Sequence, residues 1–480
     1  MTVHAAVTPA TLNDLLAAQR AAFNRELPVT LESRRDRLQR VARLLTDEGE
    51  RFCTAMSEDF GHRSREQSMM TDIVPSITTA KETFKALPKW MKADKRSPIF
   101  PLGLLGGSAR VEYQPKGVVG IIVPWNFPVG LTAGPLIGAL AAGNRAMIKM
   151  SEFTPATSEL MAEVVARYFD PTEVTVVTGG PDVGAEFSRL DFDHLLFTGA
   201  TAIGKHILHA AADTLTPVTL ELGGKSPVIV GRSAAVEQAA ERVALGKMLN
   251  AGQICLAPDY LLVPDEMEEE IVSALKAGAA SLYPSLLKNP DYTAVVNDRH
   301  HERLHELVAD AKAKGARVDV VNPAREDFAA SNSRKMPLHI IRDTTPDMRV
   351  MQEEIFGPVL PVATYRTIDD AIARVNAGDR PLGLYYFGTD KGEEEQVLDC
   401  TISGGVTVND VVFHNAMDDL PFGGVGPSGM GSYHGQDGFR TFSHAKAVYR
   451  QPKLDVAKLA GFKPPYGAAT TKAITKGFGG

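Results

Sequence analysis

The sequence contains little cysteine and no excess of positive charge. Three cysteines in 480 residues cannot form a disulfide framework, and an odd number of widely spaced thiols suits a reducing compartment. Lys and Arg number 51 against 58 Asp and Glu, so the net charge of −7 offers no positive field for a nucleic-acid backbone. No segment has the His and Cys spacing of a metal site. We therefore expect a cytoplasmic protein with no bound metal and no nucleic-acid partner.

The sequence also lacks a convincing membrane segment. Its N-terminus, MTVHAAVTPATLNDLL, has no basic region followed by an apolar run, as a secretory signal would. The uncharged stretch 118–144 is long enough to cross a bilayer. However, Pro124, Asn126 and Pro128 interrupt it, which is typical of a turn between a buried strand and a buried helix. We expect no contact with a membrane.

Alternating strand and helix patterns predict two α/β domains. Residues 9–50 have helical spacing, and from residue 117 onward short apolar runs alternate with helical segments. This alternation predicts doubly wound parallel sheets whose ligands lie beyond the carboxyl ends of the strands. The first series of predicted strands is GVVGIIV, RAMIKM, EVTVVTG, HLLFTG and PVTLEL, and the second lies at 259–264, 317–321, 359–365, 382–388 and 404–410. The segment ARVEYQ, at 109–114, predicts a projecting hairpin.

One of the three cysteines lies in a loop. Cys255 belongs to NAGQICLAP, where glycine and proline replace a helical core pattern. An isolated cysteine is nevertheless more often a buried, inert residue. Cys53 and Cys400 lie within helical patterns, so we interpret both as structural.

Two segments place carboxylates beside turns. Glu221 stands at the end of the predicted strand in LELGGKSP, where a carboxylate would reach the carboxyl edge of the sheet. Taken alone, it is more often a solvated charge at a strand end. In MQEEIFGPVL, Glu354 and Phe356 could line a nucleotide cleft, although a core Phe before a turn is equally ordinary.

Two other segments are candidates for phosphate and ribose binding. Gly199 and Gly204 in FTGATAIG lie between a strand and a helix, where backbone N–H groups and the helix dipole can bind a pyrophosphate. Tight turns also use glycine for steric reasons alone. Lys149 and Glu152 follow the strand RAMIKM, where a carboxylate could accept hydrogen bonds from ribose hydroxyls. A surface ion pair is the alternative for these two.

Seven motifs occur in one order: PWNFP, KMSE, FTGATAIG, LELGGKSP, NAGQIC, EEIFGPV and PFGGVGPSGMG. From about residue 10 to residue 452, the chain closely resembles the aldehyde dehydrogenase superfamily. CLAPDY and YHGQDGFRTFSHAKAV resemble its class 3 branch, and PWNFPVGLTAGPLIGALAAGNRAMIKMSE with HNAMDDLPFGGVG is most similar to bacterial coniferyl aldehyde dehydrogenases. The resemblance implies the aldehyde dehydrogenase fold: a Rossmann-like cofactor domain (1–102 and 117–221), a catalytic domain (222–420), a small β oligomerisation hairpin and strand (103–116 and 440–455) and a C-terminal tail (456–480).

The resemblance also implies a role for each candidate. Cys255 is the expected nucleophile, Glu221 the general base, and the Asn126 amide, with the Cys255 backbone N–H, the donor to the oxyanion. We expect NAD as cofactor because the charge of Glu152 should repel a 2′-phosphate, although class 3 relatives often accept NADP as well. The expected cofactor contacts are Trp125, Lys149, Glu152, Gly199, Gly204, Glu354 and Phe356.

Taken together, these implications predict oxidation of an aldehyde to its acid through a thiohemiacetal and a thioester, with coniferyl aldehyde as the first choice of substrate. The alternatives are another aromatic or a medium-chain aldehyde, transfer of the acyl group to coenzyme A, and a silent binding homologue. Class 3 members are usually dimers, so we expect a homodimer formed through ARVEYQ and KAVYRQP. Two residues depart from the family pattern: Met150 replaces a proline, and Ala200 replaces a hydroxyl-bearing residue whose loss could cost roughly 1 kcal/mol of cofactor binding.

Overall fold

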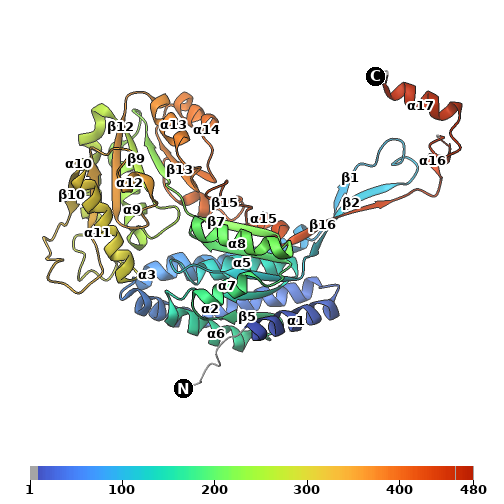
Figure 1. The fold of residues 1–480 in the computed structure, drawn as a ribbon, viewed down its shortest axis with the longest axis horizontal. Helices are drawn as coiled ribbons and strands as arrows, with labels where there is room; N and C mark the ends of the chain where they lie inside the picture. The colour runs from blue at the N-terminus through green and yellow to red at the C-terminus, as the bar shows by residue number, and fades with distance from the viewer. Residues whose placement is uncertain (1–8, 460, 479–480) are drawn as a thin grey trace.

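The computed structural model describes residues 9–459 and 461–478, which form two α/β units and a projecting arm (Figure 1). The parts of the predicted ranges 1–102 and 456–480 that fall on residues 1–8, 460 and 479–480 lie outside the described residues. Each unit carries helices on both faces of its sheet, so the doubly wound α/β fold predicted from the sequence is confirmed.

The first unit is built on a six-stranded sheet with the order β15-β7-β6-β3-β4-β5. Its strands are parallel except β15, which runs antiparallel to β7. The five parallel strands are those predicted from the sequence. The strands are β3 (Val118–Ile122), β4 (Arg145–Lys149), β5 (Val174–Val177), β6 (His194–Gly199), β7 (Val218–Leu222) and β15 (Gly429–Met430). The helices are α1 (Pro9–Glu26), α2 (Leu31–Phe60), α3 (Arg65–Ser68), the π-helical turn η1 (Met69–Ile73), α4 (Val74–Trp90), α5 (Gly130–Ala142), α6 (Pro155–Tyr168), α7 (Pro181–Ser188) and α8 (Thr201–Thr214).

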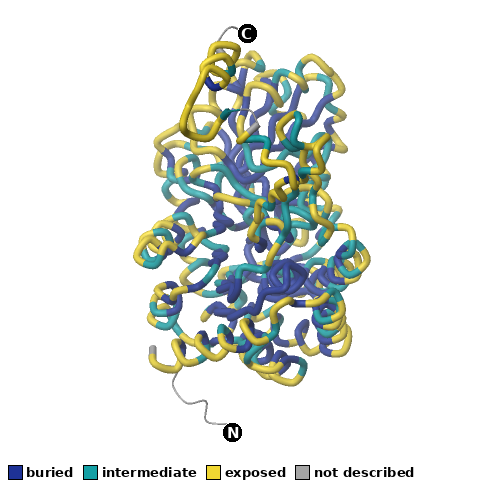
Figure 2. The backbone as a smooth tube through the Cα atoms, turned by 90° about the vertical axis from the view of Figure 1, so that its right-hand side faces the viewer, coloured by how far each residue is buried: buried dark blue, intermediate teal, exposed yellow. Residues whose placement is uncertain are grey.

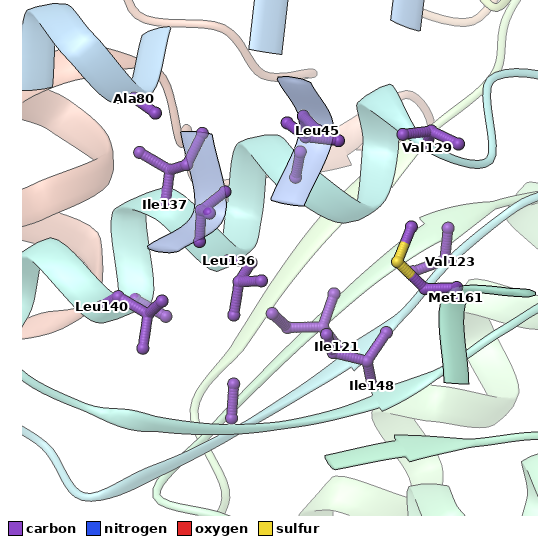
Figure 3. Close-up of a cluster of buried hydrophobic side chains, with 14 of the residues drawn as sticks. Leu45, Ala80, Ile121, Val123, Val129, Leu136, Ile137, Leu140, Ile148 and Met161 are labelled. Atoms are coloured by element: carbon purple, nitrogen blue, oxygen red, sulfur yellow. The ribbon is translucent and has the colours of Figure 1, made fainter. Parts of the chain in front are cut away.

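Helix α5 lies at the centre of the core of this unit. It is apolar on every side because it packs between the sheet and helices α2 and α4 (Figure 3). Leu136 and Leu140 of α5 point toward Ile121 of β3 and Ile148 of β4, all of them almost fully buried (Figure 3). Ile137 points to the other side of the helix, toward α4. The helix ends at Gly143, whose φ of +93° is a left-handed conformation that glycine adopts without strain.

The second unit is built on a seven-stranded sheet with the order β10-β11-β12-β9-β8-β13-β14. It is parallel except for β10, which runs antiparallel to β11 at one edge. Each strand of the second predicted series is present, and the structure adds β8 and β11. The strands are β8 (Pro227–Val230), β9 (Tyr260–Pro264), β10 (Arg317–Val321), β11 (Leu338–Arg342), β12 (Val359–Tyr365), β13 (Gly383–Phe387) and β14 (Gly405–Val408). The helices are α9 (Val236–Met248), the 3-10 turn η2 (Leu249–Gly252), α10 (Glu268–Leu282), α11 (Asp298–Ala313), α12 (Arg349–Gln352), α13 (Ile368–Ala377) and α14 (Lys391–Cys400), with short 3-10 turns at Asp265–Met267 and Phe413–Ala416.

The arm is a three-stranded antiparallel sheet with the order β1-β2-β16 that extends away from both units (Figure 1). ARVEYQ lies in its middle strand, and the first strand already begins at Asp94, before the range 103–116. The arm consists of β1 (Asp94–Arg96), β2 (Ser108–Pro115) and β16 (Ser443–Arg450); α15 (Gly435–Thr441) precedes β16, and α16 (Val456–Leu459) and α17 (Ala468–Phe478) follow it.

Burial follows the two sheets, which form buried layers, whereas the C-terminal segment beyond the arm is largely exposed (Figure 2). Within the described part of the chain, no helix combines the length and the apolar character that a membrane span requires.

Candidate active site

A cleft of about 1350 Å³ opens at the carboxyl ends of β3, β4, β6 and β7. This is the edge at which a doubly wound sheet binds its ligands. The cleft is lined by every candidate site residue except Gly204: Trp125, Asn126, Lys149, Glu152, Gly199, Glu221, Cys255, Glu354 and Phe356. The structure therefore brings together residues that are separated by up to 231 positions in the sequence.

Gly204 is buried behind the cleft wall. A Cβ atom at this position would lie 2.8 Å from the Cδ2 atom of Leu222, so the glycine lets α8 pack closely against β7. Gly199 and Ala200 lie in front of it and line the cleft. Ala200 is the N-cap residue of α8, and it supplies no side-chain hydrogen bond to the helix. The N-terminus of α8 thus faces the cleft with its backbone N–H groups.

Cys255 is positioned by a strained turn. Asn250, Ala251 and Gly252 have successive φ values of +51°, +52° and +71°, which turn the chain sharply after α9. A Cβ atom on Gly252 would lie 2.5 Å from the Gly357 carbonyl oxygen, so only glycine fits there. Cys255 is half-buried, and burial, followed by the charge of two nearby carboxylates, raises its pKa to about 12. The thiol is therefore neutral near pH 7 and needs a proton acceptor before it can attack.

Glu221 is such an acceptor. It is the penultimate residue of β7, and its side chain lines the cleft while the residue is only 3% exposed. Neither of its carboxylate oxygens has a hydrogen-bond partner among the described residues. Burial raises the pKa of Glu221 well above its ordinary value. A buried carboxyl group that lines a cleft and has no hydrogen-bond partner among the described residues is suited to take up and release protons.

Asn126 supplies a hydrogen-bond donor to the same cleft. The residue is 2% exposed, and its Nδ2 atom donates to the backbone carbonyl of Gln253 at 3.1 Å. Because a side-chain amide carries two N–H groups, one remains for a ligand. Gln253 is two residues before Cys255, so this bond ties the donor to the loop that carries the thiol.

The loop after β4 forms another part of the cleft wall. Lys149 is buried, and its Nζ atom donates to the carbonyls of Met150 at 2.7 Å and Gly179 at 2.8 Å. An ammonium group has three N–H donors, so one is left for a ligand. Glu152 is exposed, and no ion pair joins it to Lys149 among the described residues. The N–H of Met150 donates to the Val177 carbonyl at 3.1 Å, a bond that a proline could not make.

Glu354 and Phe356 approach the cleft from the second unit. Glu354 accepts a hydrogen bond from the Gly224 backbone N–H at 3.1 Å, and burial, followed by the charge of Asp259, raises its pKa to about 7. A Cβ atom on Gly223 would lie 2.1 Å from the Glu354 carboxylate, so the glycine at this position leaves room for that side chain. The Phe356 ring packs edge-to-face against Trp125 with a centroid distance of 5.3 Å.

The cleft lining also includes residues that were not among the candidates, two of them aromatic residues of the late motifs. Tyr433 and Phe422 line the cleft, and their rings pack edge-to-face with a centroid distance of 6.0 Å. Tyr433 is close enough to the reacting groups for the charges of Glu221 and Cys255 to add to the rise in its pKa that burial causes. Both residues lie in motifs that carried the family resemblance, PFGGVGPSGMG and YHGQDGF, but nothing in those letters shows which side chains face the cleft. Among the described residues, no three His, Cys, Asp or Glu side chains come together as a metal site.

The fold, the cleft and the order of the motifs together define the class of protein to which this chain belongs. The model of the aldehyde dehydrogenase family matches residues 1–448, and the chain belongs to that family. It is thus an NAD(P)-dependent aldehyde dehydrogenase by class.

Individual relatives narrow the comparison. The chain is 55% identical to the "Probable coniferyl aldehyde dehydrogenase" of Caulobacter vibrioides, covering 97% of this chain and 96% of that protein. It is 53% identical to the "Coniferyl aldehyde dehydrogenase" of Pseudomonas sp. strain HR199 (95% and 94%), and 36% identical to the rat "Aldehyde dehydrogenase, dimeric NADP-preferring" (95% and 98%). The resemblance to class 3 members and to coniferyl aldehyde dehydrogenases is confirmed.

Solved structures agree with this assignment. Staphylococcus aureus AldH in a substrate-bound state superposes with a TM-score of 0.89 at 34% identity, covering 97% of this chain and 99% of that one. An aldehyde dehydrogenase of Mycobacterium tuberculosis in complex with NAD+ superposes with a TM-score of 0.83 at 26% identity (93% and 92%).

Proposed function

We propose that this protein oxidises an aromatic aldehyde, coniferyl aldehyde first, to its carboxylic acid with NAD, using Cys255, Glu221 and Asn126. One observation carries the chemical part of the proposal: a half-buried thiol, a buried carboxyl that has no partner in the described part of the chain, and a hydrogen-bonded amide donor line one cleft. A homologue kept only for binding would gain nothing from a buried carboxylate without a hydrogen-bond partner, because burying such a group lowers the stability of the fold. This arrangement favours catalysis over the silent homologue.

The reaction begins with proton transfer from the Cys255 thiol to Glu221. The sulfur then adds to the aldehyde carbon, and the carbonyl electron pair moves to the oxygen, where the free N–H of Asn126 and the backbone N–H of Cys255 stabilise the charge. NAD(P), when bound, supplies the acceptor for the hydride that leaves as the oxyanion collapses to a thioester. Glu221 releases the thiol proton to solvent and, as a carboxylate again, removes a proton from water, which attacks the thioester carbon and releases the acid and the Cys255 thiolate. The proton on Glu221 then returns to the Cys255 sulfur, which restores the starting state.

The residues present fit a dinucleotide. The cleft is large enough for one, and the N-terminus of α8 presents backbone N–H groups for a pyrophosphate. The unused N–H of Lys149 and the exposed carboxylate of Glu152 would hold the adenosine ribose, and Glu354 with Phe356 would hold the nicotinamide half. Gly204 would act on the cofactor only through the packing of α8. The NAD-bound relative supports this assignment, and the NADP-preferring relative supports some tolerance of NADP.

Glu152 should set the preference for NAD. We expect a higher kcat/KM with NAD than with NADP for the wild type, and Glu152→Gln should narrow that ratio by roughly fivefold, the effect of ~1 kcal/mol between two charges ~4 Å apart in water. Steady-state kinetics with both cofactors measures the ratio. Glu159→Gln, at an exposed position on α6 outside the cleft lining, is the matched control and should leave it unchanged. An unchanged ratio in Glu152→Gln would contradict this role.

Two observations support an aromatic substrate. Two relatives that are 55% and 53% identical to this chain over the aligned residues carry the names "Probable coniferyl aldehyde dehydrogenase" and "Coniferyl aldehyde dehydrogenase". In addition, apolar and aromatic side chains share the cleft with Cys255, and such a lining suits a planar ring. They are Leu131, Leu382, Phe422 and Tyr433.

Steady-state NADH formation tests the choice of substrate. The specificity constant should be highest for coniferaldehyde, lower for benzaldehyde and lowest for hexanal. A higher value for hexanal would move the assignment to medium-chain aldehydes. Acyl transfer to added coenzyme A in place of hydrolysis would establish the acylating alternative.

We also propose that the protein is a cytoplasmic homodimer with the predicted division into domains. The arm exposes large apolar side chains, among them Ile99, Phe100 and Leu104, each at least 80% exposed. A small sheet of this kind is not expected to be stable without a covering surface, and the dimeric relative supports a second copy as that cover. Three free cysteines suit the reducing cytoplasm. A light-scattering mass equal to the single-chain mass of 51.7 kDa would exclude the dimer.

A further inference from the structure

The segment from Arg63 to Asp72 contacts both loops of the reacting centre, although none of its side chains lines the cleft. It includes α3 and the π-helical turn η1, which joins α3 to α4. Turns with π-helical bonding occur mostly as single insertions in α-helices and are frequent at functional sites. Here the turn directs Asp72 toward the loop that carries Asn126.

Arg63 and Asp72 form a completely buried ion pair. Both side chains are 0% exposed, and the Arg63 Nη2 atom lies 2.7 Å from the Asp72 Oδ2 atom. The Arg63 Nη1 atom donates to the backbone carbonyl of Asn126, also at 2.7 Å. The Asp72 Oδ1 atom accepts hydrogen bonds from the backbone N–H groups of Val129 at 3.2 Å and Gly130 at 3.0 Å. The pair therefore holds the Asn126 loop at two points, one on each side of its central turn.

Gln67, which lies between Arg63 and Asp72 in the sequence, holds the loop that carries Cys255. Its amide exchanges two hydrogen bonds with Asn250: Oε1 accepts from the Asn250 backbone N–H at 3.0 Å, and Nε2 donates to Oδ1 at 3.1 Å. The Asn250 Nδ2 atom donates in turn to the carbonyls of Asn126 at 3.1 Å and Gln253 at 3.2 Å. The Gln253 carbonyl also accepts from the Asn126 side chain. Hydrogen bonds thus connect the segment to the donor amide along two routes.

A buried ion pair is a weak source of stability, because removing two charges from water costs as much as their attraction returns. Its geometric consequence is more specific. Two charged anchors hold the backbone carbonyl of Asn126 and the start of α5, and the Asn126 side chain donates to Gln253 in the loop that carries the thiol.

We propose that Arg63 and Asp72 are positioning residues that hold the Asn126 amide where it can donate to the oxygen of the reacting aldehyde. The proposal rests on the proposed role of Asn126 as donor to the oxyanion. Its consequence is that the two residues act on turnover through Asn126 and lose their effect when the amide is absent.

A double-mutant cycle tests the proposal. Asp72→Asn, nearly isosteric, and Arg63→Lys should each lower kcat by about a hundredfold, the loss that a misplacement of about 1 Å can cause, with a small change in the KM for NAD. In the Asn126→Ala background, the same substitutions should lower kcat by less than about threefold, because coupled residues are not additive. Arg37→Lys is the control: the Arg37 side chain is 3% exposed and pairs with Glu26 and Glu173, and none of these three residues lines the cleft. Arg37→Lys should leave kcat unchanged although it lowers the melting temperature by about as much as the substitutions at Arg63 and Asp72.

The outcomes separate this proposal from the function itself. Equal fold losses from Asp72→Asn in the wild-type and Asn126→Ala backgrounds would overturn it, as would an equal loss of kcat in Arg37→Lys. If Arg63→Lys does not fold, the cycle with Asp72→Asn alone decides. Failure of the proposed function would look different: Asn126→Ala would turn over aldehydes as fast as the wild type, or the wild type would oxidise none of them.

Discussion

Replacing Cys255 by alanine should lower the formation of NADH from every aldehyde by at least about 10⁴-fold, as the loss of a covalent nucleophile does in other enzymes. Without the sulfur, the aldehyde carbon carries no electron-rich adduct from which a hydride can leave. NAD binding, measured by quenching of protein fluorescence, should be retained, because Cys255 is only one of many side chains that line the cleft.

Cys400→Ala is the matched control for this experiment, since Cys400 is an exposed residue at the end of α14. It should leave turnover at the wild-type level. Activity that survives in Cys255→Ala, or disappears in Cys400→Ala, would contradict the assignment of the nucleophile.

Glu221→Gln should separate the two halves of the reaction. The amide cannot take the proton of the hydrolytic water, so steady-state turnover should fall by about 10² to 10⁴-fold. A first burst of NADH, up to one per active site, should remain visible by stopped flow but should form more slowly than in the wild type, because Glu221 also accepts the thiol proton. Hydroxylamine, which attacks a thioester without a general base, should restore part of the turnover.

The pH dependence follows from the environment of Glu221. Burial raises its pKa, and the active form is the ionised carboxylate. Hydrolysis by the wild type should therefore decline as the pH falls through the raised pKa, and this decline should be absent in Glu221→Gln. Loss of the burst together with steady-state turnover would show that Glu221 is needed for the attack of Cys255, whereas unchanged turnover would exclude it as the base.

The reacting centre could be predicted from the sequence because its parts lie at the ends of recognisable strands. Glu221 follows the apolar run of β7, and Gly199 follows that of β6, so the rule for parallel sheets places both at one edge. The position of Cys255 beside these residues was predicted only from the family resemblance. No local sequence pattern relates the turn η2, which precedes Cys255, to the strand β7.

Other features have no local signal. β8 is only four residues long, and β1 reads Asp-Lys-Arg, so neither offers an apolar alternation. The alternation of β10 gives its exposed face but not its direction, which is antiparallel to its neighbour β11. Arg63 and Asp72 meet Asn126 and Val129 across some sixty positions, and charged residues in a helical segment ordinarily predict a solvated surface.

The strand β15 has a consequence for how the chain can be divided. It follows the last strand of the second sheet, returns to the first unit and pairs with β7 at Glu221. A fragment that ends at residue 420 would contain complete sequences for the other strands of both sheets, yet it would leave the backbone of β7 unpaired along one side. Such an open edge invites pairing with other chains. The two units are therefore interleaved rather than consecutive, and neither is a separable module by simple truncation.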